Sequence, residues 1–148
     1  MDTRAVLAEL APRGPDGHGE TTASGTSWTA TLLHTRLSIL DLTEAAAQPM
    51  HDARGFSLVF NGEIFNHAEL REDLLQRGES FRSTGDTEVV LKGLVVQGPA
   101  FLQRMRGPFA LGLLDRSSGV LLLARDRLGV NPLYVAEHPG GLAFASTV

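Results

Sequence analysis

The sequence predicts an α+β fold, with helices in the first two thirds of the chain and consecutive strands in the last third. Two amphipathic segments with helix start and stop signals lie between residues 66 and 97. Four short apolar runs, separated by turn sequences, lie between residues 108 and 146. Runs that lie so close together leave no room for crossover helices, so we expect antiparallel pairing. Helices grouped apart from strands are typical of a layered α+β fold.

The composition is typical of one globular domain, which we expect to span residues 1–148 without repeats. Of the 148 residues, 43% are hydrophobic and 20% are charged, which excludes a disordered chain. No apolar run approaches the roughly 20 residues that cross a bilayer, and residues 1–4 do not open a signal peptide. We therefore expect a cytoplasmic protein that does not bind membranes. The excess of acidic residues, 17 against 13 basic ones, argues against nucleic-acid binding.

The N-terminal segment predicts one short amphipathic helix over residues 3–11. Its apolar side chains recur at helical spacing: Val6, Leu7 and Leu10. Pro12 and the glycine-rich residues 13–19 end this helix, because proline and glycine interrupt regular structure. Residues 20–27 are small and polar, which predicts a turn or loop.

Two strands are expected next. Residues 28–39 combine β-branched, aromatic and aliphatic side chains, which favours a strand. Residues 41–54 read as a connecting loop. Residues 56–60 form a continuous apolar run that is typical of a buried strand, and Asn61-Gly62 directly after it is a strong turn signal.

Two helices are expected in the middle of the chain. In the first, Asn66–Gln76, Asn66 is the expected N-cap and Glu69 its capping-box partner. In the second, Asp86–Gln97, Asp86 is the expected N-cap and Gly98-Pro99 the stop. Residues 100–104 are expected to add one more helical turn.

The last third predicts an antiparallel meander of four strands. The four apolar runs are residues 108–115, 120–126, 133–137 and 142–146. The turns between them are rich in glycine, proline, serine and asparagine, which are the residues that turns prefer.

Generic catalytic and binding motifs do not identify a function. The sequence contains neither a phosphate-binding loop, a complete GxGxxG motif, a GxSxG elbow nor an HExxH motif, and its five histidines lack metal-ligand spacing. We therefore expect no metal site. The sequence also contains no cysteine, which excludes disulfides, thiolate metal ligands and a cysteine nucleophile within these residues.

Three short stretches place polar groups where an apolar core would not need them. Arg36 lies inside a strand-like run, where a guanidinium requires a carboxylate partner, unless it faces water at an edge strand. Asn61-Gly62 offers an amide and a glycine N–H, which can form an oxyanion hole or simply a tight turn. Asp86 at a helix start can bind an ammonium group or act as an ordinary N-cap.

Together these residues predict a site for a free amino acid with an amide side chain. Arg36 would hold the α-carboxylate and Asp86 the α-amino group. Asn61 and Gly62 would face the side-chain carbonyl.

The sequence resembles the N-terminal glutaminase domain of class II glutamine amidotransferases of the asparagine-synthetase type. The resemblance extends from about Val6 to Ser146 and rests on an ordered set of short motifs. These motifs are Arg13-Gly14-Pro15-Asp16-Gly17, His34-Thr35-Arg36-Leu37-Ser38-Ile39, Asn61-Gly62-Glu63-Ile64-Phe65-Asn66-His67, Gly85-Asp86-Thr87-Glu88-Val89, Arg125-Asp126-Arg127-Leu128-Gly129-Val130-Asn131-Pro132-Leu133-Tyr134 and Leu142-Ala143-Phe144-Ala145-Ser146.

The resemblance implies the fold and the residues of the binding site. The implied fold is the four-layer α/β/β/α N-terminal-nucleophile sandwich with antiparallel sheets. Arg36 would clamp the glutamine α-carboxylate, and Glu63 and Asp86 would receive the α-amino group. Asn61 and Gly62 would form the oxyanion hole. The pocket would also be lined by the main chain of Leu37, Ser38, Ile39 and Leu40. The Arg-Gly-Pro-Asp and Arg-Asp-Arg stretches would be structural, as ion pairs and caps that fix turns.

One part of the family pattern is missing from the sequence. The family uses a cysteine at its mature N-terminus, on a first strand, and these residues begin instead in the helix that precedes Arg-Gly-Pro-Asp. Thr3 could replace it only after loss of two residues, and it would begin a helix rather than a strand. We therefore expect no catalytic residue and no useful glutaminase activity in this chain, and an open strand edge that a partner covers.

Two functions from different classes stay open. The chain is either a piece of an amidotransferase that delivers ammonia to a synthetase in asparagine biosynthesis, or a pseudoenzyme that binds glutamine or a glutamyl derivative and supports a separate synthetase chain. An independent amino-acid sensor would use the same pocket.

The expected partners are L-glutamine or a related amino acid, and a synthetase domain or chain or a second copy that covers the missing strand. No cofactor is expected in this domain, since ATP and magnesium would belong to the synthetase.

Overall fold

The computed structural model describes residues 2–37 and 44–147, which form three helices and eight strands. The helices are α1 (Thr3–Leu10), α2 (His67–Gln76) and α3 (Asp86–Gln97). The strands are β1 (Gly17–Ser24), β2 (Thr29–Arg36), β3 (Met50–His51), β4 (Phe56–Gly62), β5 (Phe109–Asp115), β6 (Leu121–Arg125), β7 (Tyr134–His138) and β8 (Gly141–Ala145). Short 3₁₀ helices span Ala11–Arg13, Glu44–Ala46 and Gly98–Arg104.

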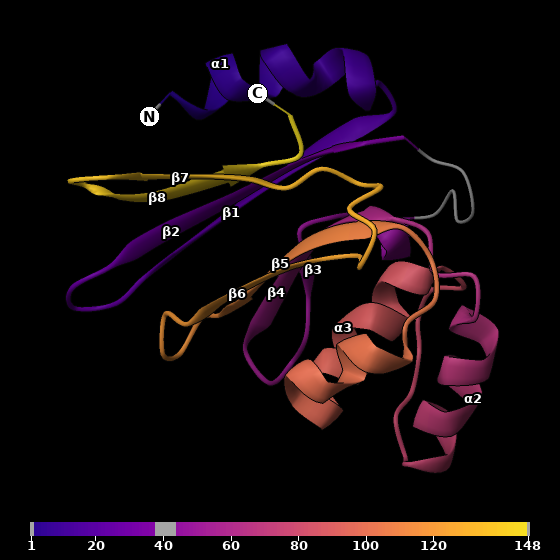
Figure 1. The fold of residues 1–148 in the computed structure, drawn as a ribbon. Helices are drawn as coiled ribbons and strands as arrows, with labels where there is room; N and C mark the ends of the chain where they lie inside the picture. Colours follow the sequence, from indigo (N-terminus) through magenta and orange to yellow (C-terminus); the bar gives the residue numbers. More distant parts are fainter. Residues whose placement is uncertain (1, 38–43, 148) are drawn as a thin grey trace.

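The elements form four layers (Figure 1). Helix α1 covers an outer β layer, in which β1 pairs with β2 and β7 pairs with β8. A central sheet with the order β3-β4-β5-β6 follows, and α2 and α3 cover its other face. The predicted α+β class and the α/β/β/α layering are confirmed.

Two apolar clusters hold these layers together. The larger one lies between the central sheet and the helices. Its fully buried members include Leu58, Ile64, Leu70, Leu74, Val89, Val90 and Phe101. The smaller cluster joins the two β layers, since Leu32 of β2 packs with Val59 of β4 and Leu114 of β5. Phe144 of β8 packs against this cluster, which ties the C-terminal hairpin to the same interface.

The loop predicted over residues 20–27 is wrong, because most of it belongs to β1. This strand pairs with β2 along its whole length, from Gly17 opposite Arg36 to Ser24 opposite Thr29. Its side chains alternate between half-buried and exposed positions. Small polar residues form a strand here because β2 supplies the backbone partners and a half-buried face, which local composition does not reveal.

The predicted meander is wrong in its connections, although all four strands exist. Strand β5 pairs with β6 in the central sheet, whereas β7 pairs only with β8 among the residues that the structure describes. The segment between Arg125 and Tyr134 carries the chain from the central sheet to the outer layer. The four apolar runs therefore form two hairpins in two layers.

Asn66 is the N-cap residue of α2, as predicted, but it makes no side-chain capping bond, and the N-cap predicted for α3 is wrong. Asn66 precedes α2, but its side chain bonds the Arg104 carbonyl at 3.0 Å and the Arg106 N–H at 3.0 Å instead of capping the helix. Asp86 is the first residue of α3, and the N-cap is Gly85. In both cases a distant backbone segment offers the side chain a better partner than the local helix end.

None of the helices among the described residues is both long enough and apolar enough to cross a bilayer.

Gly93 provides a test of the packing between α3 and the Gly98–Arg104 segment. A Cβ at Gly93 would overlap the ring of Phe101, which is fully buried. Alanine favours helices by about 1 kcal/mol over glycine, but overpacking costs about 1–3 kcal/mol. We predict that Gly93→Ala lowers the free energy of unfolding by up to about 2 kcal/mol in urea denaturation.

Phe101→Leu is the matched background for this test, because it removes the ring that the new Cβ would meet. In that background Gly93→Ala should cost little or should stabilise the protein. An equal cost of Gly93→Ala in both backgrounds would show that the ring is not the cause.

Candidate amino-acid binding site

Most of the predicted site residues line one cavity of about 380 Å³. Its size lies within the range of small-molecule pockets. The site residues that line it are Arg36, Leu37, Asn61, Gly62, Glu63 and Asp86. The other predicted residues, Ser38, Ile39 and Leu40, lie outside the described residues. The cavity is also lined by Arg13, His34, Thr35, Ala46, Gln48, Phe60, Gly85 and Thr87.

The end of β2 presents Arg36 to this cavity. Side chains two residues apart on a strand share a face, so Arg36, His34 and the buried Leu32 point toward the central sheet. The Arg-Gly-Pro-Asp segment fixes this end of the strand, since the Asp16 N–H donates to the Arg36 carbonyl at 3.0 Å. Gly14 allows the close approach, because any Cβ there would overlap the backbone of Thr35 and Arg36.

Asn61 and Gly62 are the last two residues of β4 and not the predicted turn. They pair with Ala110 and Phe109 of β5. Gly62 is required by packing, since a Cβ there would overlap the Pro108 carbonyl and the Phe109 backbone. Asn61 therefore lies on a rigid strand, which suits a group that must aim at a ligand. Its role in an oxyanion hole stays a prediction.

Gln48 binds the edge of β4 that faces away from β5, next to Asn61. Its side-chain Oε1 accepts the Phe60 N–H at 2.6 Å, and its Nε2 donates to the Phe60 carbonyl at 3.1 Å. The side-chain amide thus occupies the place of a neighbouring strand. This contact fixes the main chain immediately before Asn61.

Asp86 connects the start of α3 to the end of β4. Its carboxylate is buried, with 5% of the residue exposed, and Oδ2 accepts the Ile64 N–H at 2.8 Å. A carboxylate has about four acceptor positions, so Asp86 can bind this N–H and an ammonium group together. The location at the first turn of α3 also favours its negative charge.

Two further side chains hold the loop that leads to Asp86. The buried Glu88 carboxylate accepts the N–H groups of Arg82 and Ser83 and the Ser83 hydroxyl. Arg71 donates to the Ser83 carbonyl at 3.0 Å and to the Gly85 carbonyl at 2.8 Å. These bonds to the main chain set the position of Asp86 from both sides of the loop.

The charges that line the cavity are balanced. Arg13 and Arg36 supply two guanidinium groups, and Glu63 and Asp86 supply two carboxylates. A zwitterion with one carboxylate and one ammonium group finds a partner of opposite charge for each end. No group of three or more histidine and acidic side chains able to hold a metal ion exists in the part of the chain that the structure describes.

His34 adds a neutral imidazole to this wall. Its pKa is lowered to about 4, mainly by burial and to a smaller extent by the charge of Arg36, while the hydrogen bond to the Phe60 carbonyl acts in the opposite direction. The ring is therefore uncharged at pH 7. Its Nδ1 is buried and has no hydrogen-bond partner among residues 2–37 and 44–147.

Sequence reasoning missed several wall residues. His34 could have been found, because it lies two residues before Arg36 and so shares its face. Arg13 was expected to be structural, and its Nη1 donates to the Ser146 carbonyl at 2.9 Å while the residue also lines the cavity. Gln48 lay in a predicted loop, where nothing indicated its contact with Phe60.

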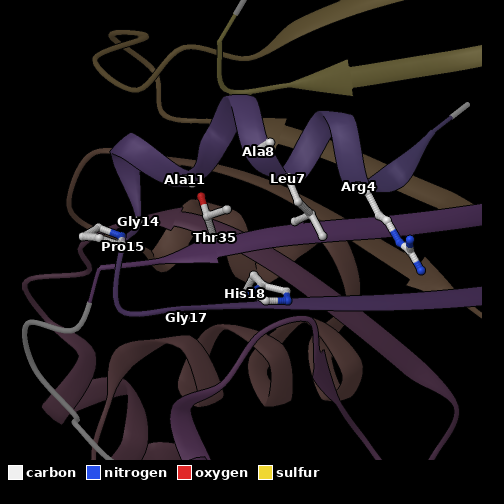
Figure 2. A pocket seen from close by; sticks show the side chains of 9 residues that line it. All are labelled: Arg4, Leu7, Ala8, Ala11, Gly14, Pro15, Gly17, His18 and Thr35. Carbon is white, nitrogen blue, oxygen red and sulfur yellow. The ribbon is translucent and has the colours of Figure 1, made fainter.

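A second cavity of about 350 Å³ lies between α1 and the strands β1 and β2 (Figure 2). Arg4 and Leu7 of α1 point toward the strands, and His18 and Thr35 line the strand side. None of the predicted site residues lines this cavity, and it contains no acidic side chain. It therefore lacks the charge pair that an amino acid requires.

Known proteins resemble this chain along nearly its whole length. A family described as "Glutamine amidotransferase domain" matches residues 1–148. A putative glutamine-hydrolyzing asparagine synthetase of Mycobacterium tuberculosis is 41% identical over 140 residues, which cover 90% of this chain and 22% of that protein. The glutamine-hydrolyzing asparagine synthetase B of Escherichia coli is 37% identical over 136 residues, covering 91% of this chain and 24% of that protein. The chain thus spans about a quarter of the length of these curated relatives.

A solved structure shares the fold. The glutamine phosphoribosylpyrophosphate amidotransferase of Bacillus subtilis superposes with a TM-score of 0.75 at 20% identity, covering 95% of this chain and 37% of that chain. The described layers are those of the N-terminal-nucleophile sandwich, as the sequence predicts.

The neutral state of His34 predicts a pH-dependent stability. Its pKa is lower in the folded protein than the ordinary value of 6.5. The contribution of the neutral ring to folding stability is therefore complete above pH 6.5 and is lost as the pH falls toward 4. The loss is up to about 3 kcal/mol, given about 1.4 kcal/mol for each pKa unit. We predict that the free energy of unfolding of the wild type, relative to that of His34→Gln, falls by up to this amount from pH 7.5 to pH 4.5. Urea denaturation of both proteins at the two pH values measures it.

The comparison is internally controlled. Burial and Arg116 also lower the pKa of His51, but His51 is present in both proteins and its effect cancels. A stability difference that does not change with pH would contradict the lowered pKa of His34.

Proposed function

Because the chain belongs to the glutamine amidotransferase domain family, and to its asparagine-synthetase type, we propose that its cavity binds L-glutamine. The observation that carries this proposal is the convergence of a guanidinium, a buried carboxylate and a strand-end amide on one cavity. These are the groups that recognise, in turn, an α-carboxylate, an α-ammonium and a side-chain carbonyl.

The roles follow the chemistry of each group. Arg36 binds the α-carboxylate, and Asp86 with Glu63 binds the α-ammonium. The Asn61 amide and the Gly62 N–H donate to the side-chain carbonyl, where negative charge develops when an amide is attacked. The main chain near Leu37 completes the wall of the pocket.

The wider activity depends on parts beyond these residues. The relatives are about four times as long as the matched region, and their names describe glutamine-hydrolyzing asparagine synthetases. We propose that the partner is a synthetase domain or chain that receives ammonia, and that ATP and magnesium belong to that partner. A second copy of this chain is the alternative partner.

The absence of cysteine favours a second candidate function. The 148 residues hold no thiol. The alternative is a non-catalytic module that binds glutamine or a glutamyl derivative and supports a separate synthetase chain. The coding sequence upstream of Met1 distinguishes these two functions. An in-frame Cys-Gly-Ile start would support a piece of a catalytic amidotransferase, whereas the absence of such a start would support the non-catalytic module.

Calorimetry with L-glutamine tests the binding site. We expect saturable binding to wild type and at least a tenfold weaker affinity for Arg36→Ala, because hydrogen bonds to charged groups contribute roughly 1.5–3 kcal/mol. Arg82→Ala is the matched control, since Arg82 is exposed and does not line the cavity. An equal loss in both variants, or no binding to folded wild type, would refute the proposed site.

Ammonia release tests the predicted lack of catalysis. Loss of the nucleophile from a covalent catalytic set lowers turnover by on the order of 10⁶. We predict that a polypeptide of these 148 residues releases no detectable ammonia from L-glutamine, with the E. coli asparagine synthetase B as the positive control. Turnover within tenfold of that enzyme would show that another residue serves as the nucleophile.

A further inference from the structure

The loop between β6 and β7 is organised by one buried carboxylate. Asp126 is 8% exposed and accepts four backbone N–H groups. The donors are Phe109 at 3.2 Å and Leu128, Val130 and Asn131, each at 3.1 Å. Such a set of bonds fixes the main chain of the loop up to Asn131.

Asn131 extends this order to the candidate site. Its backbone N–H is held by Asp126, and its side-chain Nδ2 donates to the Asn61 carbonyl at 2.8 Å. The two residues are 70 positions apart in the chain. Asn131 therefore bridges a fixed loop and the strand end that carries the predicted carbonyl-binding amide.

The orientation of Asn61 matters more than that of an ordinary strand residue. A group that donates to a ligand must keep its place within about 0.5 Å, and a shift of about 1 Å can cost on the order of a hundredfold in function. Gln48 fixes the preceding residue, and Asn131 fixes Asn61 itself. Neither Asn131 nor Asp126 lines the cavity.

We propose that Asn131 is a positioning residue, which holds the Asn61 main chain so that the Asn61 amide and the Gly62 N–H point at the side-chain carbonyl of the bound amino acid. This inference rests on the proposed function, because the carbonyl is that of glutamine. Asn131 acts through Asn61 and does not touch the ligand. Asp126 fixes the loop from which Asn131 reaches the strand.

Two amino-acid probes separate positioning from a general structural role. L-Glutamine and L-norvaline share the α-carboxylate and α-ammonium groups, but only L-glutamine has a side-chain carbonyl. A loop that merely stabilises the fold would affect both probes equally. Loss of positioning at Asn61 affects L-glutamine alone.

The variants are Asn131→Asp, which replaces the donor by an acceptor of the same shape, and Asn131→Ala, which removes the group without adding a charge. Val130→Ala is the control, because Val130 is exposed and its backbone N–H still binds Asp126 in the variant. We expect both Asn131 variants to lose roughly fivefold to tenfold in L-glutamine affinity by calorimetry. Their affinity for L-norvaline should stay within about twofold of wild type, and Val130→Ala should match wild type for both probes.

Amide NMR of the ligand-free proteins provides a readout that does not depend on glutamine binding. We expect the Asn61 side-chain and Gly62 backbone signals to shift in both Asn131 variants and to stay in place in Val130→Ala. Unshifted signals, or equal losses for L-glutamine and L-norvaline, overturn the inference. Shifted signals in a protein that binds neither probe support the positioning contact and refute the proposed function instead.

Discussion

The Asp126 carboxylate fixes how the central sheet and the outer β layer are joined. Burial alone would raise the pKa of this carboxyl group, but four backbone N–H groups outweigh that effect and the pKa lies below its ordinary value. The group therefore keeps its charge and binds both Phe109 at the start of β5 and the loop that leads to β7. Because this loop is held tightly, the chain leaves the central sheet after β6 and enters the layer that α1 covers.

The candidate site is built mainly from side chains that bind the main chain of another segment. Asp86 holds the Ile64 N–H, Gln48 holds both polar groups of Phe60, and Asn131 holds the Asn61 carbonyl. Each of these contacts fixes the backbone beside a residue that faces the cavity. The arrangement therefore exists before any ligand arrives, which lowers the entropy cost of binding.

The sequence was informative where a residue type disagreed with its surroundings. Arg36 in an apolar strand and Asp86 at the start of an apolar helix indicated a polar site, and both line the cavity. The two long helices could be predicted from their periodicity, and the end of α3 from Gly98. Strand β1 could not, because its small polar residues resemble a loop until β2 pairs with them. The placement of β6 and β7 in different layers and the partners of the Asn66 side chain could not be predicted either. Each depends on hydrogen bonds to residues far away in the chain.

The side-chain amide of Gln48 also affects how this protein meets other chains. An unpaired strand edge is a template for intermolecular pairing and aggregation. Strand β3 pairs with β4 only at Leu58 and Ser57, so the Phe60 N–H would otherwise be open, while the Phe60 carbonyl also has a hydrogen bond to His34. Gln48 binds both the N–H and the carbonyl of Phe60, so a strand from another chain would have to displace this side chain before it could pair there. The molecule can thereby leave a ligand-sized opening beside β4 without offering its backbone there to a second polypeptide.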